Sequence, residues 1–383
     1  MASAWKIYDA ALVGLGRIGY SLGLDKKREQ PASHTMALLD NPRISLLAGV
    51  DSDELKLKVW KSANKKASVY SDSANLYARS KLDIVTVAVN EESHLKESLA
   101  AISSKPRLVI LEKPVALNMK EALRIKEASE INKVPLLINH ERRFADDYIL
   151  AKNYMKEIGD LISLKAVLHS GLPVYNPAEE SSGAYSLLHD GTHLADIVLF
   201  FLEGDESSSV KTVQVPHCEK KDCKGLLDRA KKCSELGFEE KIRNDILFNP
   251  LLTGLKKDEK GCIRQLTASY TTSLCTDVSL TISGRSSFFG FEVDITGTKG
   301  RIRIGNGLLE LYKRQESPYY SNFYSLVKDE GVKLPKKTKY FSNMIKNAVD
   351  FLDGKAELKS TLQNGINALA VLEEIKEKII RNY

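Results

Sequence analysis

The segment Gly14-Leu-Gly-Arg-Ile-Gly19 constrains the fold of this chain more than any other feature. It follows an apolar run, Ala10–Val13, that predicts a β-strand, and we expect a helix to begin within it. In that context the first glycine allows a tight turn, the second lets the backbone approach a pyrophosphate, and the third lets the helix pack on the strand. The motif therefore predicts a dinucleotide site lined by Gly14, Gly16, Arg17, Ile18 and Gly19; the alternative is a glycine turn without a ligand.

The rest of the first third predicts a parallel sheet. Apolar, β-branched runs alternate with amphipathic stretches, a pattern typical of parallel strands joined by crossover helices. Runs that are apolar almost throughout fit a sheet covered on both faces. The expected strands are Ala10–Val13, Ile44–Val50, Asp83–Val89, Arg107–Leu111 and Val134–Ile138, with helices that include Glu92–Ile102 and Lys120–Ile131.

Beyond residue 140 the pattern becomes that of an α+β domain. A helix over Asp146–Ile158, a strand over Leu161–His169 and a helix over Tyr185–Phe201 precede a strand-rich segment with short turns, which predicts an antiparallel sheet. We expect an α/β chain with two domains: a Rossmann domain with a doubly wound parallel sheet (1–139) and an α+β domain with a large, mostly antiparallel open sheet (140–383). The later strands and helices are expected at Gln265–Leu274, Asp277–Ser283, Phe288–Thr296, Arg301–Ile304, Leu308–Tyr312, Phe341–Leu352 and Leu362–Ile380.

An insertion is expected at about 204–262. It contains a histidine and three cysteines that could suggest zinc, but their spacing matches no standard zinc arrangement. We therefore expect ordinary thiols and no metal site, and the role of the insertion stays open. The residues concerned are His217, Cys218, Cys223 and Cys233.

Composition excludes several classes of protein. The 56 basic and 50 acidic residues leave a formal charge of +6, and the lysine pairs are spread along the chain. Dispersed charge argues against a nucleic-acid partner but is compatible with phosphorylated or acidic small molecules. The longest apolar stretch falls short of the roughly 20 residues that span a membrane. With no secretory signal and five cysteines without framework spacing, we expect a cytoplasmic protein.

Asp51 ends the second expected strand, where an acidic side chain accepts the ribose hydroxyls of NAD and repels a 2′-phosphate. It lies 32 residues after Gly19, whereas about 20 is usual. A polar loop, Leu24–Ser33, inserted between helix and strand would explain the excess. Asp51 therefore predicts NAD rather than NADP as cofactor; alternatively it caps a helix over Glu54–Lys65.

Two further clusters carry chemistry. Glu112-Lys113-Pro114 follows a buried strand, so Lys113 should point into the crevice where doubly wound sheets bind ligands. On the expected helix, His189, Asp190 and His193 should share one face, which suggests an oriented base with a pKa near neutrality. The alternatives for this second cluster are a polar helix face or a pair of metal ligands.

These features together resemble the Gfo/Idh/MocA family of oxidoreductases, which includes glucose–fructose oxidoreductase and inositol dehydrogenase. The resemblance rests on the glycine motif, His94 after the third strand, and Glu112-Lys113-Pro114. It also rests on Gly191-x-His193-x-x-Asp196, Arg143-Phe144, the segment Phe291–Gly300 and the C-terminal helix pair. One departure is His189, which stands where family members usually carry aspartate, with Asp190 one place later. Another is Val89-Asn90, which stands where Thr-Pro is common.

The resemblance implies a Rossmann domain followed by a domain whose open sheet often joins subunits, hence a homodimer or homotetramer. It implies that Lys113 and His193 are catalytic. The expected cofactor contacts, besides the glycine loop and Asp51, are Val89, Asn90, His94, Glu112 and Lys113.

The resulting hypothesis is an NAD(P)-dependent oxidoreductase that transfers hydride between nicotinamide and a secondary alcohol of a sugar, cyclitol or nucleotide sugar. His193 would accept the hydroxyl proton, Lys113 would stabilise alkoxide charge, and Asp190 would orient His193. We expect Arg143, His189 and His193 to contact substrate, with Arg142 and His140 nearby; alternatively His189 has a catalytic role and relays a proton. The alternatives are an NAD-dependent glycosidase-type lyase or hydrolase and a non-catalytic NAD-binding regulator. The loop Gly171–Gly183 carries no readable recognition motif, so the substrate is not identified by sequence.

Overall fold

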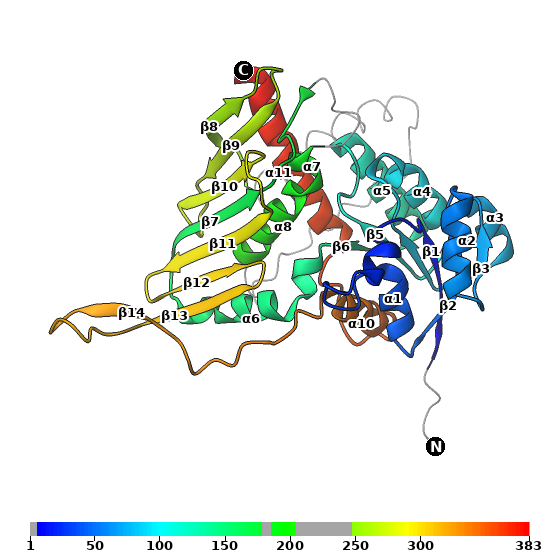
Figure 1. The fold of residues 1–383 in the computed structure, drawn as a ribbon, viewed down its shortest axis with the longest axis horizontal. Coiled ribbons are helices and arrows are strands. Elements are labelled where there is room, and N and C mark those ends of the chain that lie inside the picture. The colour runs from blue at the N-terminus through cyan, green and yellow to red at the C-terminus, as the bar shows by residue number, and fades with distance from the viewer. Residues whose placement is uncertain (1–5, 178–184, 204–246, 383) are drawn as a thin grey trace, which may run out of the picture.

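The computed structural model describes residues 6–177, 185–203 and 247–382, which form two sheets with helices packed between and around them (Figure 1). The first sheet has six parallel strands in the order β3-β2-β1-β4-β5-β6. The second has eight strands in the order β14-β13-β12-β11-β7-β10-β9-β8, in which the β7–β10 pair is parallel and the other pairs are antiparallel. This architecture confirms the expected fold class.

The first sheet forms because its central strands are apolar at nearly every position and are covered on both faces. The side chains of Asp53, Asp72 and Asn118 accept N–H hydrogen bonds at the starts of α2, α3 and α5 and so fix where these helices begin. The elements are β1 (Tyr8–Val13), α1 (His34–Asp40), β2 (Ile44–Val50), α2 (Glu54–Ala63), β3 (Ser68–Tyr70), α3 (Ser73–Arg79), β4 (Ile84–Val87), α4 (His94–Ser103), β5 (Leu108–Glu112), α5 (Met119–Asn132) and β6 (Leu136–Asn139).

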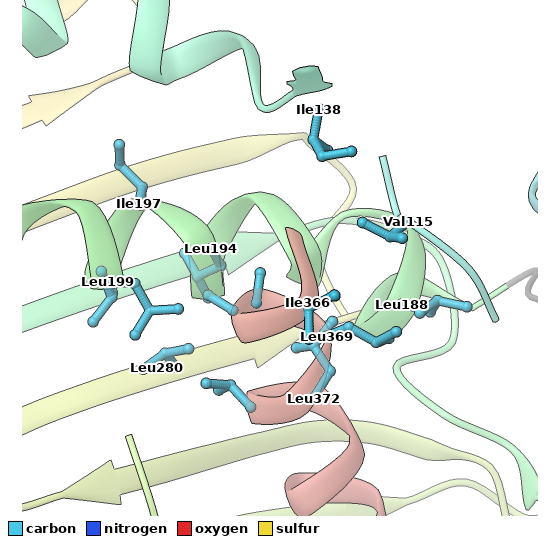
Figure 2. Close-up of a cluster of buried hydrophobic side chains, with 14 of the residues drawn as sticks. Val115, Ile138, Leu188, Leu194, Ile197, Leu199, Leu280, Ile366, Leu369 and Leu372 are labelled. Atoms are coloured by element: carbon cyan, nitrogen blue, oxygen red, sulfur yellow. The ribbon is translucent and has the colours of Figure 1, made fainter. Parts of the chain in front are cut away.

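The second sheet buries one face against helices, since buried and more exposed residues alternate along strands such as β11. Figure 2 shows Leu194 of α8 and Leu369 and Leu372 of α11 on the side of α8 where Leu280 of β10 lies, while Ile197 points to the other side of α8. The elements are α6 (Asp146–Tyr154), β7 (Leu161–His169), α7 (Ser186–His189), α8 (Gly191–Leu202), β8 (Leu251–Lys257), β9 (Ile263–Tyr270), β10 (Asp277–Ser283), β11 (Gly290–Gly297), β12 (Gly300–Gly305), β13 (Leu308–Glu316), β14 (Tyr324–Lys328), α10 (Tyr340–Leu352) and α11 (Leu362–Asn382).

The last part of the chain joins the two sheets. Helix α11 contacts α8 on one side and α5 and β6 on the other, and α10 returns to the first sheet, where Phe341, Met344 and Ile345 share a core with β1. The division into 1–139 and 140–383 stays a prediction. No helix in the described ranges has the length and apolar character needed to cross a membrane.

The helix expected directly after the glycine motif is interrupted. A turn and a short 3-10 helix, η1 (Ser21–Leu24), follow the motif, and α1 begins only at His34. The amides of His34 and Thr35 donate to the carbonyls of Ile18 and Gly19, at 3.0 Å each, so the helical ladder resumes after the excursion. The expected insertion therefore lies within this helix, over residues 20–33, and not between helix and strand.

Three other expectations need correction. The helix over Tyr185–Phe201 is broken at Asp190 into α7 and α8. Strand β8 falls inside the range expected to be an insertion and forms an edge of the second sheet; its mostly exposed residues gave no alternating pattern. Strands β3 and β14 were also not expected. Residues 178–184 of the Gly/Pro-rich loop, and the histidine and cysteines at 217–233, lie outside the described residues.

Candidate active site

A cavity of about 770 Å³ opens at the carboxyl ends of β1, β4 and β5, beside α7 and the start of α8. Ligands of doubly wound sheets bind at this edge. The cavity brings together residues of the glycine loop, of the turns after β4 and β5, and of α7 and α8. Its lining includes Gly16, Arg17, Ile18, Val89, Asn90, Glu91, Glu112, Lys113, Asn139, Arg142, His189, Asp190 and His193.

The three glycines of the motif play different structural roles. Gly14 has a φ of +98°, and a Cβ there would lie 2.3 Å from the carbonyl oxygen of Ala88. A Cβ on Gly19 would lie 2.1 Å from the carbonyl oxygen of Gly14. Around Gly16, by contrast, a Cβ would meet nothing within 4 Å, and this residue lines the cavity. Gly14 and Gly19 therefore shape the loop, while Gly16 leaves open space where a pyrophosphate would approach.

Asp51 holds the glycine loop. Its carboxylate accepts hydrogen bonds from the amide of Leu15 at 2.9 Å and from the amide of Asp53 at 3.0 Å. Lys56 Nζ lies 3.7 Å away, and the Asp51 side chain is only 10% exposed. Asp53 caps α2, so the alternative reading of Asp51 as that cap is wrong. Its contact with a cofactor ribose stays a prediction.

Glu112 is buried and anchors the end of β5. One carboxylate oxygen lies 2.6 Å from His34 Nε2 and accepts a hydrogen bond from Asn139 Nδ2, also at 2.6 Å. Burial opposes ionisation, yet these contacts hold the pKa of Glu112 below its usual value. The sequence did not predict these contacts of His34 and Asn139, because the two residues come from α1 and β6 and no local pattern links them to Glu112.

Lys113 is held by the last residue of α7. Its ammonium donates a hydrogen bond to the carbonyl oxygen of His189 at 2.8 Å. The ring of His189 contacts Glu91 in turn, with Nδ1 and Oε1 2.6 Å apart. Burial opposes the charge on Glu91, but this contact and the nearby Lys113 lower its pKa to about 2. Glu91 is a further site residue that sequence reasoning missed.

His193 is half-buried at the start of α8 and lines the cavity. Burial, and then the positive charges of Lys113 and Arg142, hold its pKa well below the ordinary value. The expected pKa near neutrality is therefore wrong, because burial and neighbouring positive charges both disfavour the imidazolium. His193 is a neutral imidazole at physiological pH.

Asp190 does not orient His193. It stands between α7 and α8, directly before the first residue of α8. Within the described part of the chain no side-chain contact joins them; the bond between them runs from the His193 amide to the Asp190 carbonyl. Burial opposes the charge on Arg142, but Tyr148, Glu141 and Asp190 raise its pKa.

The two adjacent arginines have different surroundings. Arg143 is buried; its Nε lies 2.8 Å from Asp196 Oδ1, and its two terminal nitrogens donate to Glu203. Both carboxylates occupy its donors, so the expected contact of Arg143 with substrate is not supported. Arg142 lines the cavity instead, with its guanidinium carbon 3.8 Å from the centre of the Phe291 ring.

His94 lies beneath the cavity and does not line it. Its ring is fully buried, with Nδ1 2.6 Å from the carbonyl oxygen of Pro114 and Nε2 3.1 Å from that of Val89. It thus ties together the turns after β4 and β5, while Val89 and Asn90 face the cavity themselves. Across the residues that the structure describes, no three histidine, cysteine, aspartate or glutamate side chains are grouped so as to hold a metal ion.

The fold and this cavity define a Rossmann-type dinucleotide-binding protein. Residues 8–140 match the model of the Gfo/Idh/MocA family, described as an oxidoreductase family with an NAD-binding Rossmann fold. Inositol 2-dehydrogenase 2 of Saccharopolyspora erythraea is 30% identical over 156 residues, which are 40% of this chain and 44% of that relative. The matched segment thus spans less than half the length of that relative. Residues 8–140 are thus similar to the NAD-binding Rossmann part of the Gfo/Idh/MocA oxidoreductases.

Solved structures share the fold along nearly the whole chain. The WlbA dehydrogenase of Bordetella pertussis, solved with NADH and UDP-GlcNAcA, has a TM-score of 0.68 at 14% identity, covering 99% of this chain and 97% of that one. A dehydrogenase of Chromobacterium violaceum has a TM-score of 0.70 at 13% identity, covering 97% and 95%. An oxidoreductase of Agrobacterium radiobacter, solved with NAD+, L-tartaric acid and magnesium, has a TM-score of 0.66 at 16% identity, covering 96% and 94%.

Proposed function

We propose that this protein is an NAD-dependent dehydrogenase that acts on a secondary alcohol of a sugar, cyclitol or nucleotide sugar. One observation carries the proposal: Lys113 and His193 line the same cavity as the open backbone at Gly16. A cation, a neutral imidazole and a dinucleotide cradle are the groups that hydride transfer from an alcohol requires. The inositol dehydrogenase relative and the dehydrogenases of like fold support it.

The cofactor site proposed here uses the glycine loop, with Asn90 at the cavity and Asp51 behind the loop. A bound nicotinamide cofactor would supply the hydride acceptor. The Asp51 carboxylate adds negative charge where a 2′-phosphate would lie, which favours NAD. Lys56, 3.7 Å from that carboxylate, offsets part of this charge.

The proton chemistry falls to His193 and Lys113. Only a neutral imidazole accepts a proton, and the low pKa of His193 keeps it neutral. The Lys113 ammonium stabilises negative charge on the substrate oxygen and so lowers the pKa of the alcohol. Because Lys113 is held by the His189 carbonyl, this cation is in place before substrate binds. Arg142 and His189 supply further donors for substrate hydroxyls.

The proposed contact between copies of the chain is the open face of the second sheet, giving a homodimer or homotetramer. Phe288 and Phe289 are exposed beside it, at 62% and 54%. Exposed aromatic side chains of this kind are common at protein interfaces. Light scattering of the purified protein reports the number of subunits, and a monomer would contradict this part of the proposal.

The function is tested by following NADH formation over a panel of sugars, cyclitols and nucleotide sugars. We expect turnover of at least one alcohol by the wild type and loss of that turnover in Lys113→Ala. The exposed Lys120→Ala serves as a matched control, and equal turnover by wild type and Lys113→Ala would remove Lys113 from the mechanism. Release of a glycosidic leaving group without net NADH would indicate the hydrolase alternative. Cofactor binding without any turnover would indicate the regulator.

A further inference from the structure

A second cavity, of about 780 Å³, adjoins the catalytic cavity. The two share Arg28, Glu141, Arg142 and Asn306 in their walls, so they meet at these four residues. A substrate whose reacting carbon lies at His193 can therefore extend past Arg142 into the second cavity. We propose that this second cavity binds a phosphate or diphosphate group of the substrate. The inference rests on the proposed dehydrogenase function and narrows its substrate class to phosphate-bearing sugars or cyclitols.

The walls of the second cavity come from two segments that are hydrogen-bonded to each other. One is the excursion at residues 20–33 that interrupts the motif helix, and the other is the strap at residues 331–339 between β14 and α10. The Glu29 carboxylate accepts hydrogen bonds from the amide of Thr338 at 2.8 Å and from the amide of Lys339 at 2.6 Å. The excursion is thus tied to the strap, and the cavity between them has defined walls.

Each segment brings two cations to the cavity. Lys27 and Arg28 come from the excursion, and Lys336 and Lys337 come from the strap. Among the described residues, none of the three lysines takes part in an ion pair. Arg28 has one weak contact, with Nε 3.5 Å from Asp25. The cavity therefore collects positive charge that the protein itself does not neutralise.

Three carboxylates also line the cavity, but they are fewer than its five cationic side chains. Glu29 is engaged by backbone amides, and Glu141 lies 3.2 Å from Arg142. Burial raises the pKa of Asp147. Like charges that converge on a concave site repel each other unless an anion joins them, and lysine and arginine clusters of this kind recognise phosphate oxygens.

The test is calorimetric titration of inorganic pyrophosphate into the protein saturated with NAD, which removes competition at the glycine loop. We expect saturable binding, and the double variant Lys336→Ala/Lys337→Ala should weaken it roughly tenfold or more, because hydrogen bonds to charged groups contribute strongly to binding. The double variant Lys65→Ala/Lys66→Ala removes the same charge from exposed residues after α2 and should bind as the wild type does. Urea unfolding of each variant checks that it is folded.

Absence of pyrophosphate binding to the wild type would overturn the inference, as would equal weakening by both double variants. This titration needs no turnover, so its result is independent of the dehydrogenase assay. Pyrophosphate binding without NADH formation would contradict the proposed function but support the anion site. A second titration, with UDP and with glucose 6-phosphate, distinguishes the two kinds of substrate that could carry the phosphate group. Tighter binding of UDP supports a nucleoside diphosphate sugar, tighter binding of glucose 6-phosphate supports a sugar phosphate, and binding of neither overturns the assignment to substrate.

Discussion

The ammonium of Lys113 donates a hydrogen bond to the main-chain carbonyl of His189, 2.8 Å away. The bond ties the end of β5, in the first sheet, to α7 beside the second sheet. It holds a positive charge next to the half-buried ring of His193, whose pKa is well below the ordinary value. The cation that we propose to stabilise substrate charge is thus also one cause of the low pKa of the proposed proton acceptor.

Replacing Lys113 by methionine should raise the pKa of His193. Removal of a positive neighbour favours the imidazolium, while burial, the larger cause, continues to hold the pKa below the ordinary value. The shift is measured by NMR titration of the histidine ring protons, with His193→Asn identifying the signal. Asp190→Asn should move the same signal little, because Asp190 does not contact the ring. An unchanged pKa in Lys113→Met would contradict the electrostatic account.

Two glycine variants should separate folding from cofactor binding. Gly19→Ala places a Cβ 2.1 Å from a backbone oxygen, so it should destabilise the protein by about 1–3 kcal/mol. Gly16→Ala meets nothing within 4 Å, so stability should be kept while NADH affinity falls on the order of tenfold, because the Cβ enters the pyrophosphate space. Urea unfolding and fluorescence titration with NADH report the two effects. Unchanged NADH affinity in Gly16→Ala would mean that the cofactor binds elsewhere.

The buried ion pairs of Arg143 should matter for stability. Arg143→Met leaves Asp196 buried beside only His140, and breaking a buried pair in this way costs about 3–5 kcal/mol. The exposed pair Lys165–Asp277 is the control, since Lys165→Met should cost less than about 1 kcal/mol. Urea denaturation gives both values, and similar small losses would show that the Arg143 cluster contributes little.

The loss of stability in Arg143→Met should become smaller as the pH is lowered. Burial opposes the charge of Asp196, but Arg143 and His140 lower its pKa. The wild type therefore has this stabilisation above the unfolded carboxyl pKa and loses it as the pH falls through the folded value. Without Arg143 the buried carboxylate is relieved by protonation, so the stability gap between wild type and Arg143→Met should narrow as the pH is lowered from neutral to about 4. A gap that widens in acid would contradict this.

Cofactor preference should depend on the charge of Asp51. We expect NADH to bind more tightly than NADPH, and Asp51→Asn should narrow the difference on the order of tenfold while an oxygen still accepts from the Leu15 amide. Fluorescence titration with both cofactors measures the ratio. A wild type that prefers NADPH would show that Lys56, and not Asp51, dominates the local charge.

Much of the architecture follows from local patterns. Alternation of apolar runs with helical stretches predicted the central strands of the first sheet, and the glycine motif with Glu112-Lys113 predicted the edge where the cavity lies. The hydrogen-bond partners of the site residues could not be predicted from such local patterns. His34 reaches Glu112, and Glu91 reaches His189, across 78 and 98 positions of the chain. Such contacts depend on how elements pack, which no local periodicity encodes.

The sequence also did not predict which side chains of a single turn point into the cavity. Arg142 and Arg143 are adjacent in a short 3-10 helix, yet one lines the cavity and the other is buried against Asp196. The break at Asp190 likewise depends on the tertiary fold, because the residues around it are compatible with one continuous helix. Sequence spacing therefore placed the histidines of α7 and α8 near the site but assigned the wrong neighbours to His193.

The most direct test of the account is the pH dependence of kcat/KM for alcohol oxidation in the wild type, His193→Asn and His189→Asn. If His193 is the proton acceptor, His193→Asn should lose the acidic limb and fall in rate by something on the order of 10²–10⁴. His189→Asn should keep the acidic limb, since the His189 carbonyl that holds Lys113 belongs to the main chain. A profile unchanged in His193→Asn but flattened in His189→Asn would show that His189, and not His193, accepts the proton.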